Sequence, residues 1–149
     1  MLAIGARAPE FTLPDANGQP VSLGGLLAHG PLVLYFYPAD FTPGCTREAC
    51  QFRDLHPSID SAALELAGVS PQSPESHRRF RDKYHLPFTL LSDVDRCVIR
   101  KYEVEGPLGL GVRRATFLID PDRTIRDVVM ADLRIGRHAA LVRRAVARE

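Results

Sequence analysis

The sequence predicts an α/β fold in which helices flank a central mixed β-sheet and a β-hairpin lies near the N-terminus. Short apolar segments of strand length alternate with segments of helical length over residues 31–102, and two strands around a turn then precede a last helix. This order is typical of an α/β sandwich around a mixed sheet. Because residues 1–149 contain no repeat, low-complexity tract or evident linker, they are expected to form a single domain.

The first third of the chain predicts a hairpin, a buried strand and a helix. Asn17-Gly18 lies between short alternating segments in FTLPDANGQPVSL, which is a good hairpin signal. PLVLYFYP is a continuous apolar and aromatic run that closes at Pro38, and it suits a central strand buried on both faces. A helix is expected from Pro43 to about Pro57.

The rest of the chain continues the alternation. LELAGVS and PFTLLSD predict strands, and helices are expected over residues 76–84 and 93–102. GPLGLG is expected to be a flexible loop, and TFLIDPDRTIRDVVM predicts two strands around a turn at Pro121-Asp122. The segment from Gly136 onward predicts a closing helix, whose packing positions are Ala139, Leu141, Val142 and Val146.

Charge, hydropathy and cysteine content indicate which partners and which cellular compartment to expect. The formal net charge is +1, which gives no reason to expect nucleic acid or an anionic membrane as a partner. No segment approaches the ~18 apolar residues of a membrane span, and MLAIGARAPEF lacks a signal-peptide pattern, so a cytoplasmic location is expected. In a reducing compartment, two close cysteines are more often redox-active or metal-bound than structural.

The segment FYPADFTPGCTREACQF, residues 36–52, places two cysteines five positions apart at the start of an expected helix. Thr42 suits the N-cap and Pro43 the first helical position, so Cys45 falls in the first turn. Unpaired backbone N–H groups and the positive end of the helix dipole favour a thiolate there. Glu48, one turn further on, would oppose the thiolate unless a cation holds it.

Other interpretations of this segment remain open on the residues alone. Cys45 shares a helical face with Ala49 and Phe52, so it could be a small core residue. A zinc module could use Cys45, Cys50 and His56, but it lacks an obvious fourth ligand. The remaining histidines are scattered along the sequence and are expected at the surface: His29, His77, His85 and His138.

The same segment carries a resemblance to a known family. PADFTPGC, residues 38–45, matches the P-x-x-x-T-x-x-C signature of peroxiredoxins, which are thiol peroxidases with a thioredoxin-like fold. The longer string TPGCTREACQFRD resembles the peroxiredoxin Q branch, also called bacterioferritin comigratory protein. Supporting matches extend over nearly the whole chain: GARAPEFTLPD, SPESHRRFRDKYHLPFTLLSD and RATFLID.

The resemblance implies a peroxidase of hydrogen peroxide and organic hydroperoxides. Cys45 would be the peroxidatic cysteine, whose thiolate attacks peroxide and becomes a sulfenic acid. Cys50 matches the resolving cysteine, which would close a disulfide that thioredoxin or a similar dithiol reduces. Thr42 would hydrogen-bond the thiolate and the peroxide, and Pro38 would shield the sulfur from water. No cofactor or metal is expected, and such proteins are often monomers.

An arginine and a glutamate complete the site that the resemblance implies. Arg114 matches the arginine of the R-x-[TS]-F pattern and would stabilise the thiolate, and Glu48 matches a glutamate that orients it. Because adjacent strand residues point to opposite faces, only one of Arg113 and Arg114 can reach the site, and the motif selects Arg114. Cys97 has no family role at its position; it is expected to be a buried or incidental thiol and is the reserve candidate for resolution.

A thioredoxin-like dithiol oxidoreductase without peroxidase activity is the nearest alternative. In an α-helix the Cα atoms of residues i and i+3 are ~5 Å apart, within disulfide reach, whereas those of i and i+5 are ~8–9 Å apart. A C-x-x-C pair can therefore close on an intact helix, but Cys45 and Cys50 cannot. The spacing favours a protein that unwinds the start of this helix between chemical steps.

Overall fold

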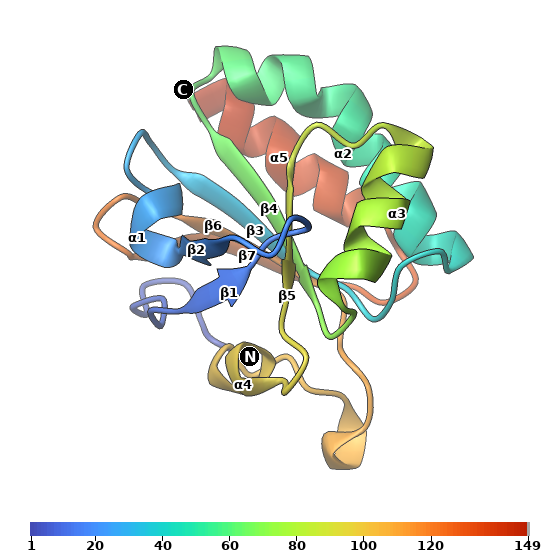
Figure 1. Ribbon diagram of the computed structural model, residues 1–149. Helices are drawn as coiled ribbons and strands as arrows, with labels where there is room; N and C mark the ends of the chain where they lie inside the picture. Colours follow the sequence, from blue (N-terminus) through green and yellow to red (C-terminus); the bar gives the residue numbers. More distant parts are fainter. Residues whose placement is uncertain (149) are drawn as a thin grey trace.

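The computed structural model describes residues 1–148 and has the predicted mixed α/β architecture (Figure 1). The central sheet has the strand order β5-β4-β3-β6-β7. Strands β3 (Leu32–Phe36), β4 (Glu65–Ser70) and β5 (Thr89–Ser92) are parallel, whereas β6 (Ala115–Ile119) pairs antiparallel with both β3 and β7 (Ile125–Met130). Since β3 is the central strand, its continuous apolar run is buried on both faces.

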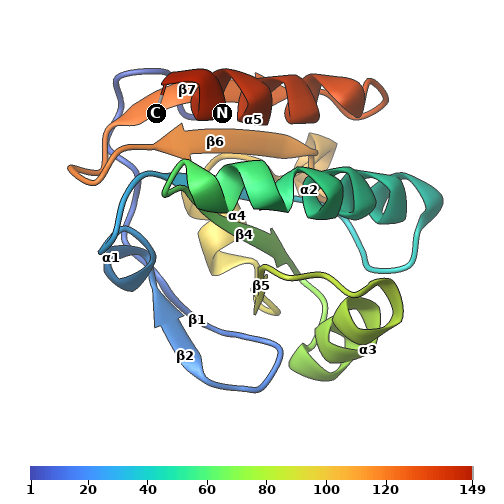
Figure 2. The same cartoon turned by 90° about the horizontal axis from the view of Figure 1, so that it is seen from above.

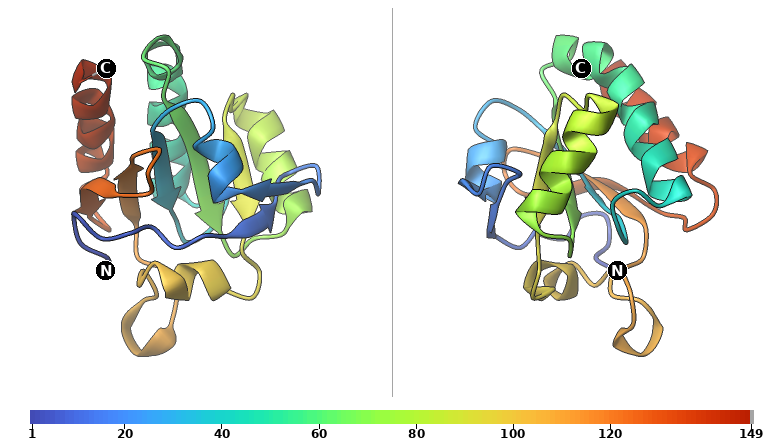
Figure 3. Two further views of the ribbon diagram at one scale, coloured as in Figure 1. Left: turned by 90° about the vertical axis from the view of Figure 1, so that its left-hand side faces the viewer. Right: turned by 45° about the vertical axis from the view of Figure 1, so that its right-hand side comes forward.

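Two layers cover the sheet. Helices α2 (Pro43–Ser61), α3 (Pro74–Tyr84) and α5 (Gly136–Arg148) pack on one face (Figures 1 and 3). The other face is covered by the hairpin of β1 (Thr12–Pro14) and β2 (Pro20–Ser22), by α1 (Leu23–Leu26) and by α4 (Cys97–Lys101). Val33 and Tyr35 of β3 point to the first layer and Leu34 to the second, as strand alternation requires. Figure 2 shows α2 and α5 side by side, running in the same direction.

Helix α2 is longer than the sequence predicts, because it continues through Pro57 to Ser61. A proline inside a helix removes one backbone hydrogen bond and costs about 3 kcal/mol. The turn after it carries Ile59, whose side chain is fully buried, and burial of such a side chain stabilises by about 1.5–3 kcal/mol. Ile59 therefore anchors a last turn that the proline alone would end.

Helix α4 is shorter than the predicted helix over residues 93–102. The carboxylate of Asp93 accepts hydrogen bonds from the backbone N–H groups of Val98 (3.2 Å) and Ile99 (2.7 Å). Arg96 has a positive φ of 62°, so residues 93–96 form a turn and the helix begins at Cys97.

Two short elements lie outside the sequence prediction. Helix α1 follows the hairpin, and its N-cap Ser22 accepts a hydrogen bond from the Gly25 N–H at 3.0 Å. Its Gly24-Gly25 pair hides the helical signal, because glycine disfavours helix. A 3-10 turn, η1 (Pro107–Gly109), lies inside the predicted GPLGLG loop. Among the described helices, none combines the length and the apolar character needed to cross a bilayer.

Candidate active site

Both cysteines of the TPGCTREAC segment lie on the first turns of α2, which begins where the loop after β3 ends. Cys45 is 1% exposed and faces inward with Ala49 and Phe52, whereas Cys50 is partly exposed. Both are free thiols. On this regular helix they are separated by about 140° around the axis, so a disulfide between them requires unwinding.

Arg114 brings a cation to the Cys45 sulfur from the other side of the helix–sheet interface. Its Nη1 and Nη2 groups each donate to Cys45 Sγ at 3.4 Å, and Nη1 also donates to Glu48 Oε1 at 2.9 Å. Arg114 is 6% exposed and Glu48 1%. The guanidinium therefore bridges the sulfur and the carboxylate in a site with little water, and it offsets the repulsion that Glu48 alone would exert on a thiolate.

Strand alternation explains why Arg114 and not its neighbour reaches the sulfur. Arg114 lies two residues before Thr116 and four before Leu118, which packs in the core beneath α2 and α5. Arg113 points away: its side chain is 40% exposed, and its Nε donates to Asp132 Oδ2 at 2.7 Å.

Burial and charge shift the pKa values of both Glu48 and Arg114. Burial raises the pKa of Glu48 to about 7, although Arg114 acts in the opposite direction. Burial opposes the charge on Arg114, but the carboxylate of Glu48 and the sulfur of Cys45 hold the pKa of the guanidinium above its ordinary value. Arg114 therefore stays charged, while Glu48 changes protonation state near neutral pH.

Two residues that the sequence analysis did not single out hold Arg114 in place. Asp132 Oδ1 accepts a hydrogen bond from the Arg114 backbone N–H at 3.0 Å, and the Asp132 carbonyl accepts from Arg114 Nε at 3.4 Å. A Cβ at Gly44 would lie 3.1 Å from Arg114 Nη2 and 3.4 Å from Ile135 Cδ1. The absence of a side chain at Gly44 thus lets the guanidinium lie against the first turn of α2.

Thr42 occupies the predicted N-cap position, but its side chain does not cap the helix. Its hydroxyl donates instead to the Ala39 carbonyl at 3.2 Å. The predicted N-cap position of Thr42 is therefore confirmed, although its hydroxyl makes no capping hydrogen bond. Thr42 is exposed and Pro38 half-buried, both on the loop that leads to Cys45.

The loop over residues 37–42 is fastened to α3 through the buried carboxylate of Asp40. Tyr37 donates its hydroxyl to Oδ1 at 2.7 Å, and Ser76 donates to Oδ2 at 2.8 Å. His77 Nδ1 lies 2.7 Å from Oδ2, and its Nε2 lies 3.0 Å from the Leu91 carbonyl. A carbonyl only accepts, so the Nε2–H of His77 donates to Leu91, and the ring joins the loop at Asp40 to strand β5.

Phe41 adds an apolar contact and local strain to the same loop. Its φ of 67° lies in the left-handed region, which is costly for a bulky residue by about 1 kcal/mol or more. Its ring packs edge-on against Phe80 of α3, with centroids 5.2 Å apart. The contacts with α3 therefore hold a loop conformation that the backbone alone disfavours.

The expectation that the scattered histidines lie at the surface is wrong for two of them. His29 and His85 are exposed, but His77 and His138 are fully buried. Each buried histidine lies on the apolar face of its helix, three residues before Phe80 or four before Val142. That periodicity was available in the sequence, whereas the polar partners that each ring contacts were not.

Cys97 lies apart from this site. It is exposed at the first position of α4, so it is not a buried thiol. Within residues 1–148, no group of three or more histidine, cysteine, aspartate or glutamate side chains is arranged to hold a metal ion.

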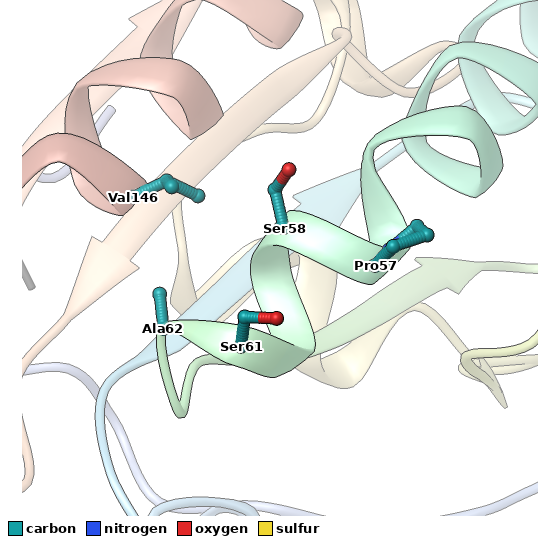
Figure 4. Close-up of a pocket in the computed structure, with 5 residues that line it drawn as sticks. All are labelled: Pro57, Ser58, Ser61, Ala62 and Val146. Carbon is teal, nitrogen blue, oxygen red and sulfur yellow. The ribbon is translucent and has the colours of Figure 1, made fainter.

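A surface hollow of about 440 Å³ lies between the C-terminal ends of α2 and α5 (Figure 4). Its lining residues are Pro57, Ser58, Ser61, Ala62 and Val146. At 1.5 Å per residue, Pro57 lies about 18 Å along the helix axis from Cys45. This hollow is therefore remote from the cysteine–arginine cluster.

Comparison with known proteins identifies the class to which this fold and site belong. Residues 4–128 match the AhpC/TSA family. The chloroplastic peroxiredoxin Q of Sedum lineare is 42% identical over 135 residues, which cover 90% of this chain and 72% of that protein. The chain belongs to the AhpC/TSA family, and within it to the peroxiredoxin Q or bacterioferritin comigratory protein type.

Solved structures agree with this assignment. Peroxidoxin BcpB from Mycobacterium tuberculosis has a TM-score of 0.93 and 36% identity, covering 99% of this chain and 98% of its own. A variant of Xanthomonas campestris peroxiredoxin Q has a TM-score of 0.85 and 34% identity, covering 93% and 92%. The predicted thioredoxin-like fold is confirmed by the mixed sheet and by these neighbours.

Proposed function

We propose that this protein reduces hydrogen peroxide and organic hydroperoxides with Cys45 as the attacking thiol, Cys50 as the resolving thiol and a thioredoxin-type dithiol as the reductant. Membership of the peroxiredoxin Q type makes it a thiol peroxidase. The single observation that supports these residue roles best is the Arg114 guanidinium, which donates two N–H groups to the Cys45 sulfur at 3.4 Å.

In the first step, the Cys45 thiolate attacks one oxygen of the peroxide and the O–O bond breaks. The thiolate, the hydroperoxide and one proton give a sulfenic acid on Cys45 and one molecule of water or alcohol. Negative charge moves from sulfur to the leaving oxygen during this step. Arg114, held in place by Glu48 and Asp132, can stabilise that charge because its N–H groups already face the reacting sulfur.

Thr42 and Pro38 are proposed to complete the peroxide site from the loop before α2. The Thr42 hydroxyl, which donates to the Ala39 carbonyl in this structure, can accept a hydrogen bond from peroxide there, or rotate to donate to it. Half-buried Pro38 would limit access of water to the sulfur. Both roles rest on the family signature and on the position of this loop.

In the second step, the Cys50 thiol attacks the sulfenic sulfur, a disulfide forms and water leaves. The first turns of α2 must unwind for this, which breaks bonds such as Thr46 N–H to the Thr42 carbonyl (2.9 Å). Each backbone hydrogen bond is worth about 1 kcal/mol net, so the unwinding costs several kcal/mol.

The third step is reduction of the disulfide by an external dithiol. A strained, partly exposed disulfide is easily attacked by such a thiol. Organic hydroperoxides are included among the substrates because the bacterioferritin comigratory protein of Xanthomonas campestris, 33% identical to this chain, was trapped in complexes that bear on its alkyl peroxide reduction. The monomeric state and the cytoplasmic location stay predictions, to be tested by sedimentation equilibrium and by cell fractionation.

A dithiol oxidoreductase without peroxidase activity is the weaker candidate. It would need a cysteine pair that closes on an intact helix, and the geometry of α2 keeps Cys45 and Cys50 on different sides of it. The buried Arg114–Glu48 pair beside a single sulfur also suits a reaction in which charge leaves that sulfur.

Peroxide consumption by the reduced protein with a thioredoxin system tests the proposal, in the wild type and in three single Cys→Ser variants. Cys45→Ser should abolish rapid reduction, because a serine hydroxyl is hardly ionised at neutral pH. Cys50→Ser should lose turnover, and Cys97→Ser should behave as the wild type. Retention of most of the second-order rate by Cys45→Ser would refute the assignment, and loss of turnover only in Cys97→Ser would transfer the resolving role.

A further inference from the structure

The buried carboxylate of Glu48 uses only one of its two oxygens on Arg114. Oε1 accepts from Arg114, but Oε2 has no hydrogen-bond partner within the described residues 1–148, although it is excluded from solvent. An unsatisfied, ionised oxygen in such a place is costly. The atom that faces it is Nδ1 of His138, on the first turn of α5, at 3.7 Å.

His138 is itself fixed by two further contacts. Its Nε2 lies 2.8 Å from the Ala131 carbonyl, which can only accept, so Nε2 carries a proton. Its Nδ1 lies 2.7 Å from the hydroxyl of Thr116, which can donate to a bare Nδ1 or accept from a protonated one. The ring is thus held in one orientation, with Nδ1 free to gain or lose a proton beside Glu48 Oε2.

We propose that His138 is a positioning residue of the peroxidatic site, which shares one proton with Glu48 and thereby sets how much of the Arg114 charge acts on Cys45. This inference rests on the proposed role of Cys45. With the proton present, the Glu48–His138 pair carries no net charge, and Arg114 is balanced by the Cys45 thiolate alone. Without it, the Glu48 carboxylate competes with the thiolate for the same guanidinium.

The surroundings place this shared proton near neutral pH. Burial raises the pKa of Glu48 to about 7. Burial also lowers the pKa of His138. The hydrogen bond to the Ala131 carbonyl raises this pKa in part, whereas the charge of Arg114 lowers it further. The other charged groups that act on the ring are Arg137 of α5, which disfavours a second proton, and Asp132, which favours it. Tyr35 of β3 stays neutral beside Glu48, because burial holds the pKa of its hydroxyl well above the ordinary value.

The strand and helix placement makes this arrangement specific to His138. Arg114 directly precedes β6 and lies two residues before Thr116, so in extended backbone the two side chains share the face that meets α2 and α5. Helices α2 and α5 start at the same end of the sheet (Figure 2), which brings the first turn of α5 to Glu48. His77, the other buried histidine, contacts Asp40 and not Glu48.

His138→Gln tests the proposal, because glutamine can still donate to the Ala131 carbonyl but cannot hold the proton. The readout is the rate of iodoacetamide alkylation of Cys45 against pH in the Cys50→Ser, Cys97→Ser background, which needs no peroxide. The variant should lower this rate by about fivefold at pH 7.5, above the pKa of about 7 at which Glu48 would hold a proton without His138; that is the lower end of a typical coupling between sites. The effect should disappear when Glu48→Gln is also present, because the coupling runs through that carboxylate.

An unchanged alkylation profile in His138→Gln would overturn the proposal, and so would an equal loss with and without Glu48→Gln, which would indicate a packing role. If His138→Gln does not fold, the His138 imidazole resonance of the wild type supplies the test. By reciprocity, its titration should move to lower pH in Cys45→Ser, where the thiolate is absent. An identical titration in both proteins would contradict the coupling, whereas loss of peroxidase activity in Cys45→Ser bears only on the function itself.

Discussion

Replacement of Arg114 by Met is the sharpest perturbation of the proposed chemistry, because it removes the cation and keeps much of the apolar stem. In the wild type, two N–H groups reach the Cys45 sulfur at 3.4 Å. Two unit charges at that distance interact by about 5 kcal/mol at an effective dielectric constant of 20.

The loss of rate should be smaller than that interaction. Glu48 loses its hydrogen-bond donor in the variant, and burial then raises the pKa of this carboxyl further, so that it becomes protonated. Its repulsion of the thiolate disappears with its charge. A net loss of ~3 kcal/mol of transition-state stabilisation is expected, which is on the order of a hundredfold in the rate constant.

The assay is the second-order rate constant of the reduced protein with hydrogen peroxide, measured by stopped flow in a single turnover. Arg113→Met is the matched control, since the Arg113 side chain is 40% exposed and donates to Asp132 rather than to the Cys45 sulfur. The control should retain nearly the wild-type rate. A normal rate in Arg114→Met together with a strongly reduced rate in Arg113→Met would show that Arg113, and not Arg114, acts on the sulfur.

Four further outcomes are expected. Cys50→Ser should react once with peroxide and leave a sulfenic acid on Cys45 that dimedone traps, and it should form more sulfinic acid than the wild type at high peroxide. Failure of dimedone to label this variant would argue against Cys50 as the resolving thiol. Gly44→Ala should slow peroxide reduction by displacing Arg114, whose Nη2 lies 3.1 Å from the added carbon, and an unchanged rate would show that the guanidinium can yield without loss. The disulfide form should show less helix by circular dichroism and faster amide exchange over residues 42–52 than the reduced form, and equal protection in both would contradict the unwinding of α2. Burial raises the pKa of Glu48 to about 7, above its ordinary value of 4.5. The protonated carboxyl therefore stabilises the folded state fully below pH 4.5, and this contribution to the free energy of unfolding is lost as pH rises through 7. Glu48→Gln should therefore remove on the order of 3 kcal/mol of the fall in unfolding free energy between pH 4.5 and 8, measured by urea denaturation, and an unchanged slope would contradict it.

Local sequence patterns predicted most of the fold, because the apolar periodicity of a strand or a helix can be recognised from residues that are close together in the chain. The failures arose where a distant or side-chain contact decided the outcome. Burial of Ile59 stabilises the turn of α2 that follows Pro57. The carboxylate of Asp93 accepts hydrogen bonds from backbone N–H groups in the first turn of α4, so the helix predicted over residues 93–102 begins later. The glycine pair of α1 gave no local signal at all.

In the candidate site, too, the features set by local geometry were predicted and those set by distant contacts were not. Helix geometry predicted an inward Cys45 and a Cys50 on another side, both of which the structure contains. The contact between Arg114 and Cys45 joins residues 69 positions apart, so only the family motif could select Arg114 over Arg113. No pattern within one segment could reveal His138 beside Glu48, since that contact exists only once α5 has packed against α2 and β6.

The most direct test of the central claim is a peptide map of the reduced protein after one equivalent of hydrogen peroxide, quenched with an alkylating reagent. If Cys50 resolves the sulfenic acid of Cys45, the map contains a peptide in which these two cysteines are joined by a disulfide, with Cys97 fully alkylated. Recovery of Cys45 as an alkylated thiol after the peroxide has been consumed, or a disulfide that includes Cys97 in its place, would contradict that claim.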